Sequence, residues 1–218
     1  MEARKKREIS IPDYTMGEEL FNAISHGIGA LLGVAALVLM LVRAKGALAV
    51  TTVALFGAAT ILLYTISCVY HALSPRVKGK KVLRVIDHCN VYLLVLGTYI
   101  PVALLGVGGA RGWWLLGVVL LFTVLGVVFT ALDVDRYQLV SVLCHLGSGW
   151  SILFGVPQLL RTLGLKGLGF LILGGVMYSI GAVLYGLGKK KRYSHSVFHV
   201  FCLLGTFFHF WAVYAFLL

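Results

Sequence analysis

The chain has 218 residues, of which 60% are hydrophobic and only 12% are charged. Globular domains carry about 25% charged residues, so this composition, with a mean hydropathy of +0.95, excludes an ordinary soluble enzyme and indicates an integral membrane protein. The formal net charge of +11 raises the alternative of a nucleic-acid partner, which the placement of the basic residues argues against.

The apolar residues fall into seven runs, each close to the roughly 20 residues that a helix needs to cross a hydrocarbon core of about 30 Å. We therefore predict an all-α fold, a seven-transmembrane helix bundle. Residues 1–21 are predicted to form a cytoplasmic basic N-terminal segment, and residues 22–218 one transmembrane domain. The predicted spans are 22–42, 48–72, 86–107, 112–132, 138–160, 168–187 and 196–218.

The first run follows a basic start, as a secretory signal peptide does, but we expect it to be a retained span. The acidic pair Glu18 and Glu19 directly precedes it, it is longer than a signal-peptide apolar region, and no small-residue cleavage site follows.

The Lys and Arg residues predict the orientation, because positively charged short loops stay in the cytoplasm. All but five of the 19 lie in the N-terminal segment or in the loops after the second, fourth and sixth spans; the five are Arg43, Lys45, Arg111, Arg161 and Lys166. The N-terminus is therefore expected in the cytoplasm and the C-terminus outside. The basic clusters then lie beside anionic lipid headgroups, and we expect no nucleic-acid partner.

Polar side chains gather at the cytoplasmic ends of three predicted spans. The second span ends in "SCVYH", with Ser67 and His71 four residues apart, and the seventh begins with His195 and His199 at the same spacing. Residues four apart lie on one face of a helix. Because the third span opens with Asp87, the predicted topology brings all five side chains to one membrane level.

Three neutral imidazoles that leave a fourth position for water match a catalytic zinc site more closely than a closed structural one. We therefore predict His71, His195 and His199 as zinc ligands, although iron, copper and nickel also accept imidazole. Asp87 is then a supporting group or a general base acting on bound water, whose pKa zinc lowers to about 7. Ser67 is a candidate donor to that water or to an oxyanion.

Other roles remain open, since hydrogen bonds between helices and proton relays also use polar residues at membrane depth. Asp87 is alternatively a charge favoured by a helix N-terminus. Glu19, Asn22 and His26 share one face of the first span and either support the metal ligands or form an interfacial helix cap. The default role of the single histidines is packing or hydrogen bonding; these are His26, His88, His145 and His209.

With these motifs in order, the chain resembles the hemolysin III family, the bacterial branch of the progestin and adipoQ receptor superfamily, and is distantly similar to alkaline ceramidases. The resemblance covers essentially the whole chain and depends on Ser67 with His71, on Asp87, and on His195 with His199. It implies a seven-helix bundle with an internal N-terminus, zinc held by the three histidines near the cytoplasmic side, and Asp87 and Ser67 around the metal-bound water. The short N-terminal segment does not imply a hormone receptor.

Three functions follow as hypotheses for a multi-pass protein of the plasma membrane whose partners are membrane lipids. The leading one is a zinc-dependent hydrolase that acts on lipid amide or ester bonds. The second is a lipid-sensing or membrane-homeostasis protein with structural zinc. The third, which the family name suggests, is a pore-forming cytolysin, although the sequence offers no ring of pore-lining charges.

Overall fold

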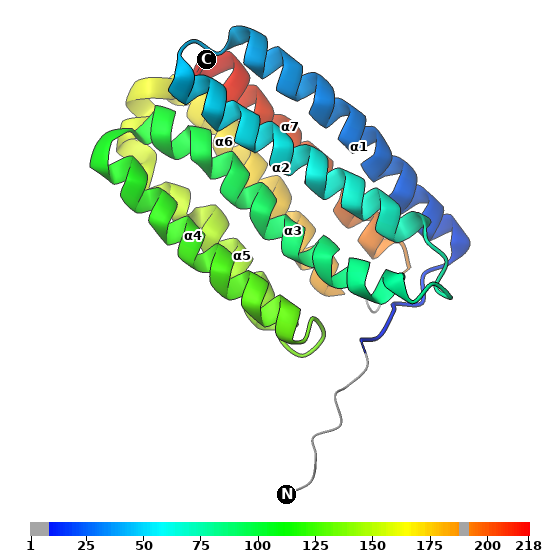
Figure 1. Ribbon diagram of the computed structural model, residues 1–218. Coiled ribbons are helices and arrows are strands. Elements are labelled where there is room, and N and C mark those ends of the chain that lie inside the picture. The colour runs from blue at the N-terminus through cyan, green and yellow to red at the C-terminus, as the bar shows by residue number, and fades with distance from the viewer. Residues whose placement is uncertain (1–8, 188–191) are drawn as a thin grey trace, which may run out of the picture.

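The computed structural model describes residues 9–187 and 192–218, and within these ranges the chain is helical, without a β-strand. Residues 1–8 of the predicted N-terminal segment and the basic cluster at 189–191 lie outside the described residues. The elements are α1 (Met16–Arg43), α2 (Ala47–Ala72), α3 (Gly79–Pro101), a π-helical continuation η1 (Val102–Val107), α4 (Gly109–Leu132), α5 (Gln138–Trp150), a 3-10 turn η2 (Ser151–Gly155), α6 (Val156–Leu187) and α7 (Ser194–Phe216) (Figure 1).

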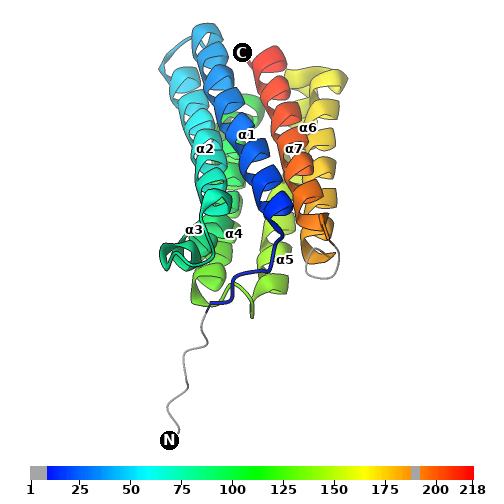
Figure 2. The ribbon, with the colours of Figure 1, turned by 90° about the vertical axis from the view of Figure 1, so that its right-hand side faces the viewer.

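Six helical segments in the described part of the chain are long and apolar enough to cross a membrane. Five of them each correspond to one predicted span. The sixth, Gln138–Gly186, has 49 residues and covers two predicted spans. Its helical path is broken at Gly164, whose φ of 65° and ψ of −179° are not helical. After this break α6 lies alongside α7 (Figure 2).

The helices pack as a bundle with an apolar outer surface. α1 packs against α2 and α7, α3 against α2 and α4, and α4 against α5. Large apolar side chains such as Leu31, Val42 and Trp113 are exposed on the outside, whereas many polar and charged side chains are buried between helices. This distribution suits a chain whose outer surface faces lipid and whose polar groups must find partners inside.

Glycines allow two of the close helix contacts. A Cβ on Gly97 of α3 would lie 2.6 Å from the Cβ of Ala59 on α2, and one on Gly174 of α6 would lie 2.3 Å from the His209 ring on α7. Both distances are too short for real atoms, so these helices approach closely only because a side chain is missing.

The two ends of the bundle differ in chemistry. The start of α1, the end of α2 and the starts of α3 and α7 lie at one end, and the end of α7 lies at the other (Figure 1). Buried apolar residues of α2, α3, α4, α6 and α7 form the core toward the second end, including Phe56, Leu94, Val119, Leu159 and Val213. The helix starts and ends gathered at the first end carry the predicted site residues.

Candidate metal centre

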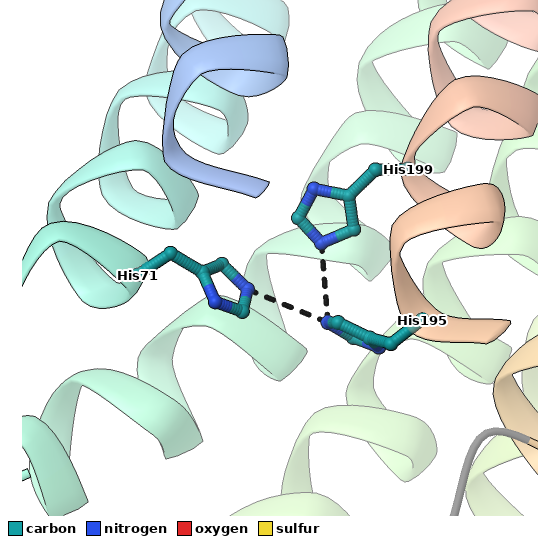
Figure 3. A group of neighbouring side chains, drawn as sticks. All are labelled: His71, His195 and His199. Carbon is teal, nitrogen blue, oxygen red and sulfur yellow. Dashed lines mark hydrogen bonds between the residues drawn. The ribbon is translucent and has the colours of Figure 1, made fainter. Parts of the chain in front are cut away.

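Three buried histidines converge between α2 and α7 (Figure 3). Nε2 of His195 lies 3.4 Å from Nε2 of His71 and 3.1 Å from Nε2 of His199. One nitrogen from each ring lies within 4.8 Å of the other two. The spacing His-x3-His puts His195 and His199 on one helix face, and the antiparallel course of the chain brings His71 to them.

The donor set fits a metal ion. Nδ1 of His71 lies 2.6 Å from the Glu19 carboxylate and therefore carries the ring proton. The lone pair of Nε2 is then available to bind a metal. One proton on His195 Nε2 cannot satisfy both neighbouring nitrogens, whereas a cation can bind all three. Tetrahedral zinc with Zn–N bonds of about 2.0–2.1 Å places ligand nitrogens about 3.4 Å apart, close to the two short separations.

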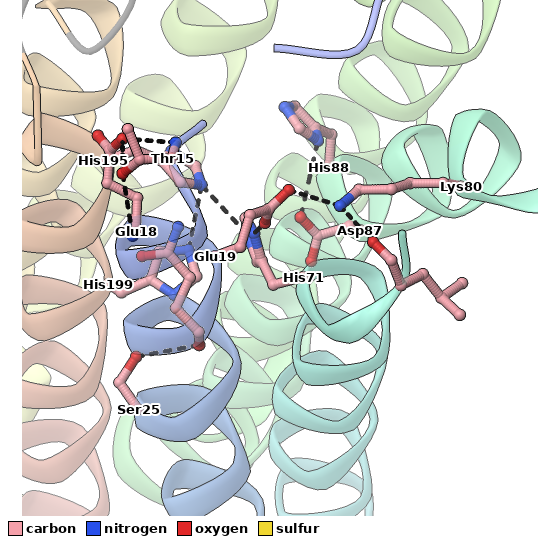
Figure 4. Close-up of polar contacts among 12 residues, drawn as sticks. Thr15, Glu18, Glu19, Ser25, His71, Lys80, Asp87, His88, His195 and His199 are labelled. Carbon is pink, nitrogen blue, oxygen red and sulfur yellow. Dashed lines mark hydrogen bonds and ion pairs between the residues drawn. The ribbon is translucent and has the colours of Figure 1, made fainter. Parts of the chain in front are cut away.

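Glu19 joins the predicted ligand His71 to a buried lysine (Figure 4). One carboxylate oxygen of Glu19 accepts from His71 Nδ1, and the other lies 2.5 Å from Nζ of Lys80 on α3. A carboxylate on the second nitrogen of a metal-binding imidazole fixes its tautomer and its ring orientation. Of the two alternatives left open for Glu19, this contact favours support of the metal ligand.

The side chain of Lys80 binds the C-terminal end of α2. Its side chain is 0% exposed, and besides Glu19 it donates to the carbonyl oxygen of Leu73, the C-cap of α2, at 2.7 Å. Its Nζ also lies 5.2 Å from the centre of the Tyr70 ring. His71 is in the last turn of α2. Lys80 therefore binds both Glu19, the partner of His71, and the end of the helix that carries His71.

The helix cap that the sequence left open belongs to Glu18 rather than Glu19. Thr15 caps α1 by accepting from the backbone N–H of Glu18, and the Glu18 carboxylate accepts in turn from the backbone N–H and the hydroxyl of Thr15, which completes a capping box. Glu18 also accepts from the backbone N–H of Tyr193, just before α7 begins. Consecutive residues of a helix point about 100° apart, so Glu18 fixes the helix starts while Glu19 faces the histidines.

Asp87 and Ser67 are buried beside the histidines. The Asp87 carboxylate lines the same cavity as His195 and lies 3.8 Å from Nδ1 of His88, and Ser67 is buried one turn before His71 on α2. Asp87 lies in the third turn of α3, two turns after Lys80. The structure thus brings Asp87 and Ser67 to the three histidines, and their chemical roles stay predictions.

Asn22 and His26 form a second buried layer behind His199. The His26 ring stacks on His199 at 3.6 Å between centroids, with 19° between the planes, and meets Tyr64 edge-on. Both side-chain polar atoms of Asn22, both ring nitrogens of His26 and Nδ1 of His199 are buried without a hydrogen-bond partner among the described residues. His26 therefore contacts the ligand His199 directly, and Asn22 lies one turn before His26 on α1.

A segment before α1, here called the N-terminal strap (residues 9–15), reaches the same centre. The Tyr14 ring stacks on His195 at 5.0 Å with 17° between the planes, and lies 5.9 Å from the His71 ring. Burial raises the pKa of the Tyr14 phenol well above its usual range, so the ring is neutral. Neither Tyr14 nor the strap was predicted from the sequence to be near the site.

Two adjoining cavities extend from the centre into the bundle. The site cavity is bounded by Asp87 and His195 together with His88, Tyr92, Tyr185 and Phe198. The deep cavity is bounded by Thr98, Tyr99, Val102, Gly149, Leu171 and Gly175, among others. His145 and Tyr178 line both, so the two spaces are neighbours in the bundle.

The remaining single histidines make contacts that suit packing and hydrogen bonding. Nδ1 of His88 donates to the carbonyl oxygen of Arg84 at 2.7 Å, and His209 Nε2 lies 3.1 Å from the carbonyl oxygen of Leu171. His145 meets the Tyr92 ring edge-on. All three line a cavity, and none belongs to the group of three that could hold a metal in the described chain.

Two cations of the basic loop, which the sequence analysis assigned only to topology and to lipid headgroups, are buried in the structure. Lys80 and Arg84 are 0% and 1% exposed, because both lie in α3 on the inward face. A signal was present: Lys80, Arg84 and Asp87 are spaced by four and three residues, so they share one helix face.

Comparison with known proteins gives a consistent result. The sequence profile described as "Haemolysin-III related" matches residues 14–210. The chain is 35% identical to "Hemolysin-3" of Bacillus cereus over 200 residues, 90% of each chain. It is 36% identical to the "Hemolysin-3 homolog" of Bacillus subtilis over 196 residues, 88% of this chain and 91% of the relative. It is 24% identical to human "Monocyte to macrophage differentiation factor" over 170 residues, 75% and 69% of the two chains.

The apolar bundle and its buried polar centre define a multi-pass helical membrane protein. Within that class, the chain belongs to the Haemolysin-III related family. The resemblance expected from the sequence motifs is thereby confirmed, with more distant relatives of the progestin and adipoQ receptor type.

Proposed function

We propose that this protein is a zinc-dependent intramembrane hydrolase that cuts an amide or ester bond in a membrane lipid. The observation that supports this most strongly is the placement of three converging buried histidines and a buried carboxylate at the end of an apolar cavity. Three protein ligands are typical of catalytic zinc sites, whereas structural sites are closed by four.

The residues around the centre suit hydrolysis. His71, His195 and His199 would hold a zinc ion, which would supply a Lewis acid to polarise a carbonyl and activate water. Asp87 accepts a proton from the attacking water and delivers it to the leaving amine or alkoxide as the C–N or C–O bond breaks. Ser67, buried one turn before His71 on α2, donates a hydrogen bond to the oxyanion on the substrate carbonyl. The products are a carboxylic acid and an amine or alcohol.

The cavities support a lipid substrate with a long acyl chain. Along α3 and into η1 the lining residues run from Asp87 to Val102, which is about 22 Å at 1.5 Å per residue. Half of a hydrocarbon core of about 30 Å is the depth of one lipid leaflet. Together the two linings therefore extend over more than the depth of a leaflet, which supports an acyl chain as the occupant.

We also propose the seven-span topology, with the N-terminus in the cytoplasm and the C-terminus outside. A straight helix of 49 residues would be about 70 Å long, more than twice the hydrocarbon thickness. The break at Gly164 divides Gln138–Gly186 into two parts, residues 138–163 and 165–186, each long enough to cross. The centre then lies near the cytoplasmic face.

The experiment for the enzymatic proposal compares purified wild-type protein with Asp87→Asn in liposomes that contain an N-acyl lipid amide or an acyl ester. We expect Asp87→Asn to retain zinc and to lose turnover by about 10²–10⁴-fold, the usual contribution of a general base. Asp133→Asn, which changes a turn aspartate outside the site, serves as the control. Equal turnover of Asp87→Asn and wild type overturns the mechanism.

One relative's name favours a second candidate, a cytolysin, since the Bacillus cereus protein is called "Hemolysin-3". The buried position of the polar centre supports the hydrolase over an open pore. Dye release from liposomes that persists in Asp87→Asn and after zinc removal would favour the cytolysin. Zinc that stabilises the fold without any lipid product would instead favour a lipid-sensing protein.

A further inference from the structure

The N-terminal strap is attached to the bundle at both ends. At one end, Arg84 on α3 donates to the backbone carbonyl of Ser10 at 2.6 Å. The Ser10 hydroxyl donates to Asp135, in the loop between α4 and α5, at 2.8 Å. At the other end, Thr15 is the N-cap of α1. Residues 11–14 lie between these two attachments.

Arg84 is the main attachment of the strap. Its guanidinium makes two hydrogen bonds to the Asp135 carboxylate, at 3.0 and 2.8 Å, in addition to the bond to Ser10. The residue is only 1% exposed, and a buried guanidinium is retained only where its charge is paired. None of the hydrolytic steps requires Arg84, so its burial is explained by the attachment of the strap and of the α4–α5 loop.

Tyr14 is the strap residue that reaches the metal centre. Its half-buried ring stacks on the His195 ring and lies close to the His71 ring. One aromatic side chain thus contacts His195 and approaches His71. The stack restricts rotation of the His195 ring about its own χ2 angle, and that rotation would move Nε2 away from the other two nitrogens. Tyr14 also covers the centre on the side from which the strap approaches.

We propose that the strap is the cover of the metal centre. Tyr14 is a positioning residue that holds His195 in its metal-binding orientation and blocks access from the strap side, and the Arg84–Asp135 pair keeps the strap closed. Detachment of the strap therefore speeds the exchange of metal. This inference rests on the metal-binding part of the proposed function and not on hydrolysis.

The experiment measures the rate at which zinc passes from purified protein to an excess of a soluble chromogenic chelator. Tyr14→Ala removes the stack and is expected to release zinc at least about tenfold faster, in line with losses seen when groups supporting a metal ligand are removed. Tyr14→Phe retains the ring and is expected to release zinc at the wild-type rate. This rescue separates ring stacking from the hydroxyl.

A second pair of variants tests the attachment. Arg84→Gln removes the charge that holds Ser10 and Asp135 and is expected to speed zinc release as Tyr14→Ala does. Arg136→Gln changes an exposed arginine next to Asp135 in the α4–α5 loop and is expected to leave the rate of zinc release unchanged. Far-ultraviolet circular dichroism and the elution volume establish that each variant is folded.

The outcomes distinguish this inference from the proposed function. Stoichiometric zinc that leaves wild type, Tyr14→Ala and Arg84→Gln at one rate overturns the cover and leaves the metal site intact. Equal acceleration in Tyr14→Phe and Tyr14→Ala overturns the stacking role. A wild-type protein that binds no metal overturns both proposals.

Discussion

Glu19 accepts a hydrogen bond from Nδ1 of His71 at 2.6 Å and at the same time pairs with Lys80. A residue of the first helix thereby orients a ligand of the second and neutralises a cation of the third. The centre is held together by charges that are all buried, so the same contacts that stabilise the bundle determine how well it binds a metal.

Replacement of Glu19 by Gln is expected to lower zinc affinity about 10–100-fold, the usual effect of removing the carboxylate behind a metal-binding histidine. The change conserves size but removes the charge that fixes the His71 tautomer. Competition with a chelator of known affinity measures the effect. Glu18→Gln is the matched control, because Glu18 bonds to Thr15 and Tyr193 and to no histidine. Equal affinities of the two variants would contradict the role of Glu19.

Replacement of Lys80 by Met is expected to destabilise the folded protein by about 3–5 kcal/mol, because it leaves Glu19 buried without its cation. Thermal unfolding in detergent measures the change against Lys78→Met, a lysine exposed two residues earlier. The double variant Glu19→Gln with Lys80→Met should recover part of the loss, since the two residues interact directly. A Lys80→Met protein as stable as Lys78→Met argues against the buried pair.

Gly175→Leu is expected to shift substrate preference toward shorter acyl chains. Gly175 lines the deep cavity, and a Cβ there meets no atom within 4 Å, so the new side chain fills the space that the lipid chain would use. Loss of two buried methylenes at about 0.8 kcal/mol each lowers kcat/KM about tenfold for the longer substrate. Hydrolysis of palmitoyl and octanoyl esters tests this.

Gly169→Leu provides the control for that shift, since Gly169 is on the same helix, is exposed and also has open space at its Cβ. An unchanged ratio of palmitoyl to octanoyl turnover in Gly175→Leu would show that the chain does not occupy the deep cavity.

The proposed topology predicts that a reporter fused to the C-terminus lies outside the cytoplasm. Alkaline phosphatase, which is active only after export, is expected to be active in this fusion, and a cytoplasmic fluorescent reporter is expected to be dark. A reporter placed after Asp133, between α4 and α5, should give the reverse pattern. Cytoplasmic signals from both positions would mean that the chain crosses the membrane an even number of times between Asp133 and the C-terminus, which would contradict the seven spans.

The sequence predicted the part of the centre that follows from local spacing. His195 and His199 share a helix face because they are four residues apart, and Ser67 and His71 do so for the same reason. Because successive helices alternate in direction, the end of α2 and the start of α7 lie together. The gap between the predicted fifth and sixth spans also coincides with the backbone break at Gly164.

The contacts that depend on long-range packing were not predictable. Tyr14 lies in a segment without regular structure, and nothing local indicates that its ring stacks on a residue 181 positions later. Asp135 resembles an ordinary loop charge until the fold brings it to Arg84. This ion pair is a property of the assembled bundle rather than of either segment.

The most direct test of the account is the metal content of detergent-purified protein prepared without chelator, beside His71→Ala, His195→Ala and His199→Ala. We expect about one zinc ion per chain in the wild type and its loss in each variant, because a tetrahedral site with three protein ligands cannot spare one. A folded wild-type protein without stoichiometric metal would contradict the centre and, with it, the proposed hydrolase.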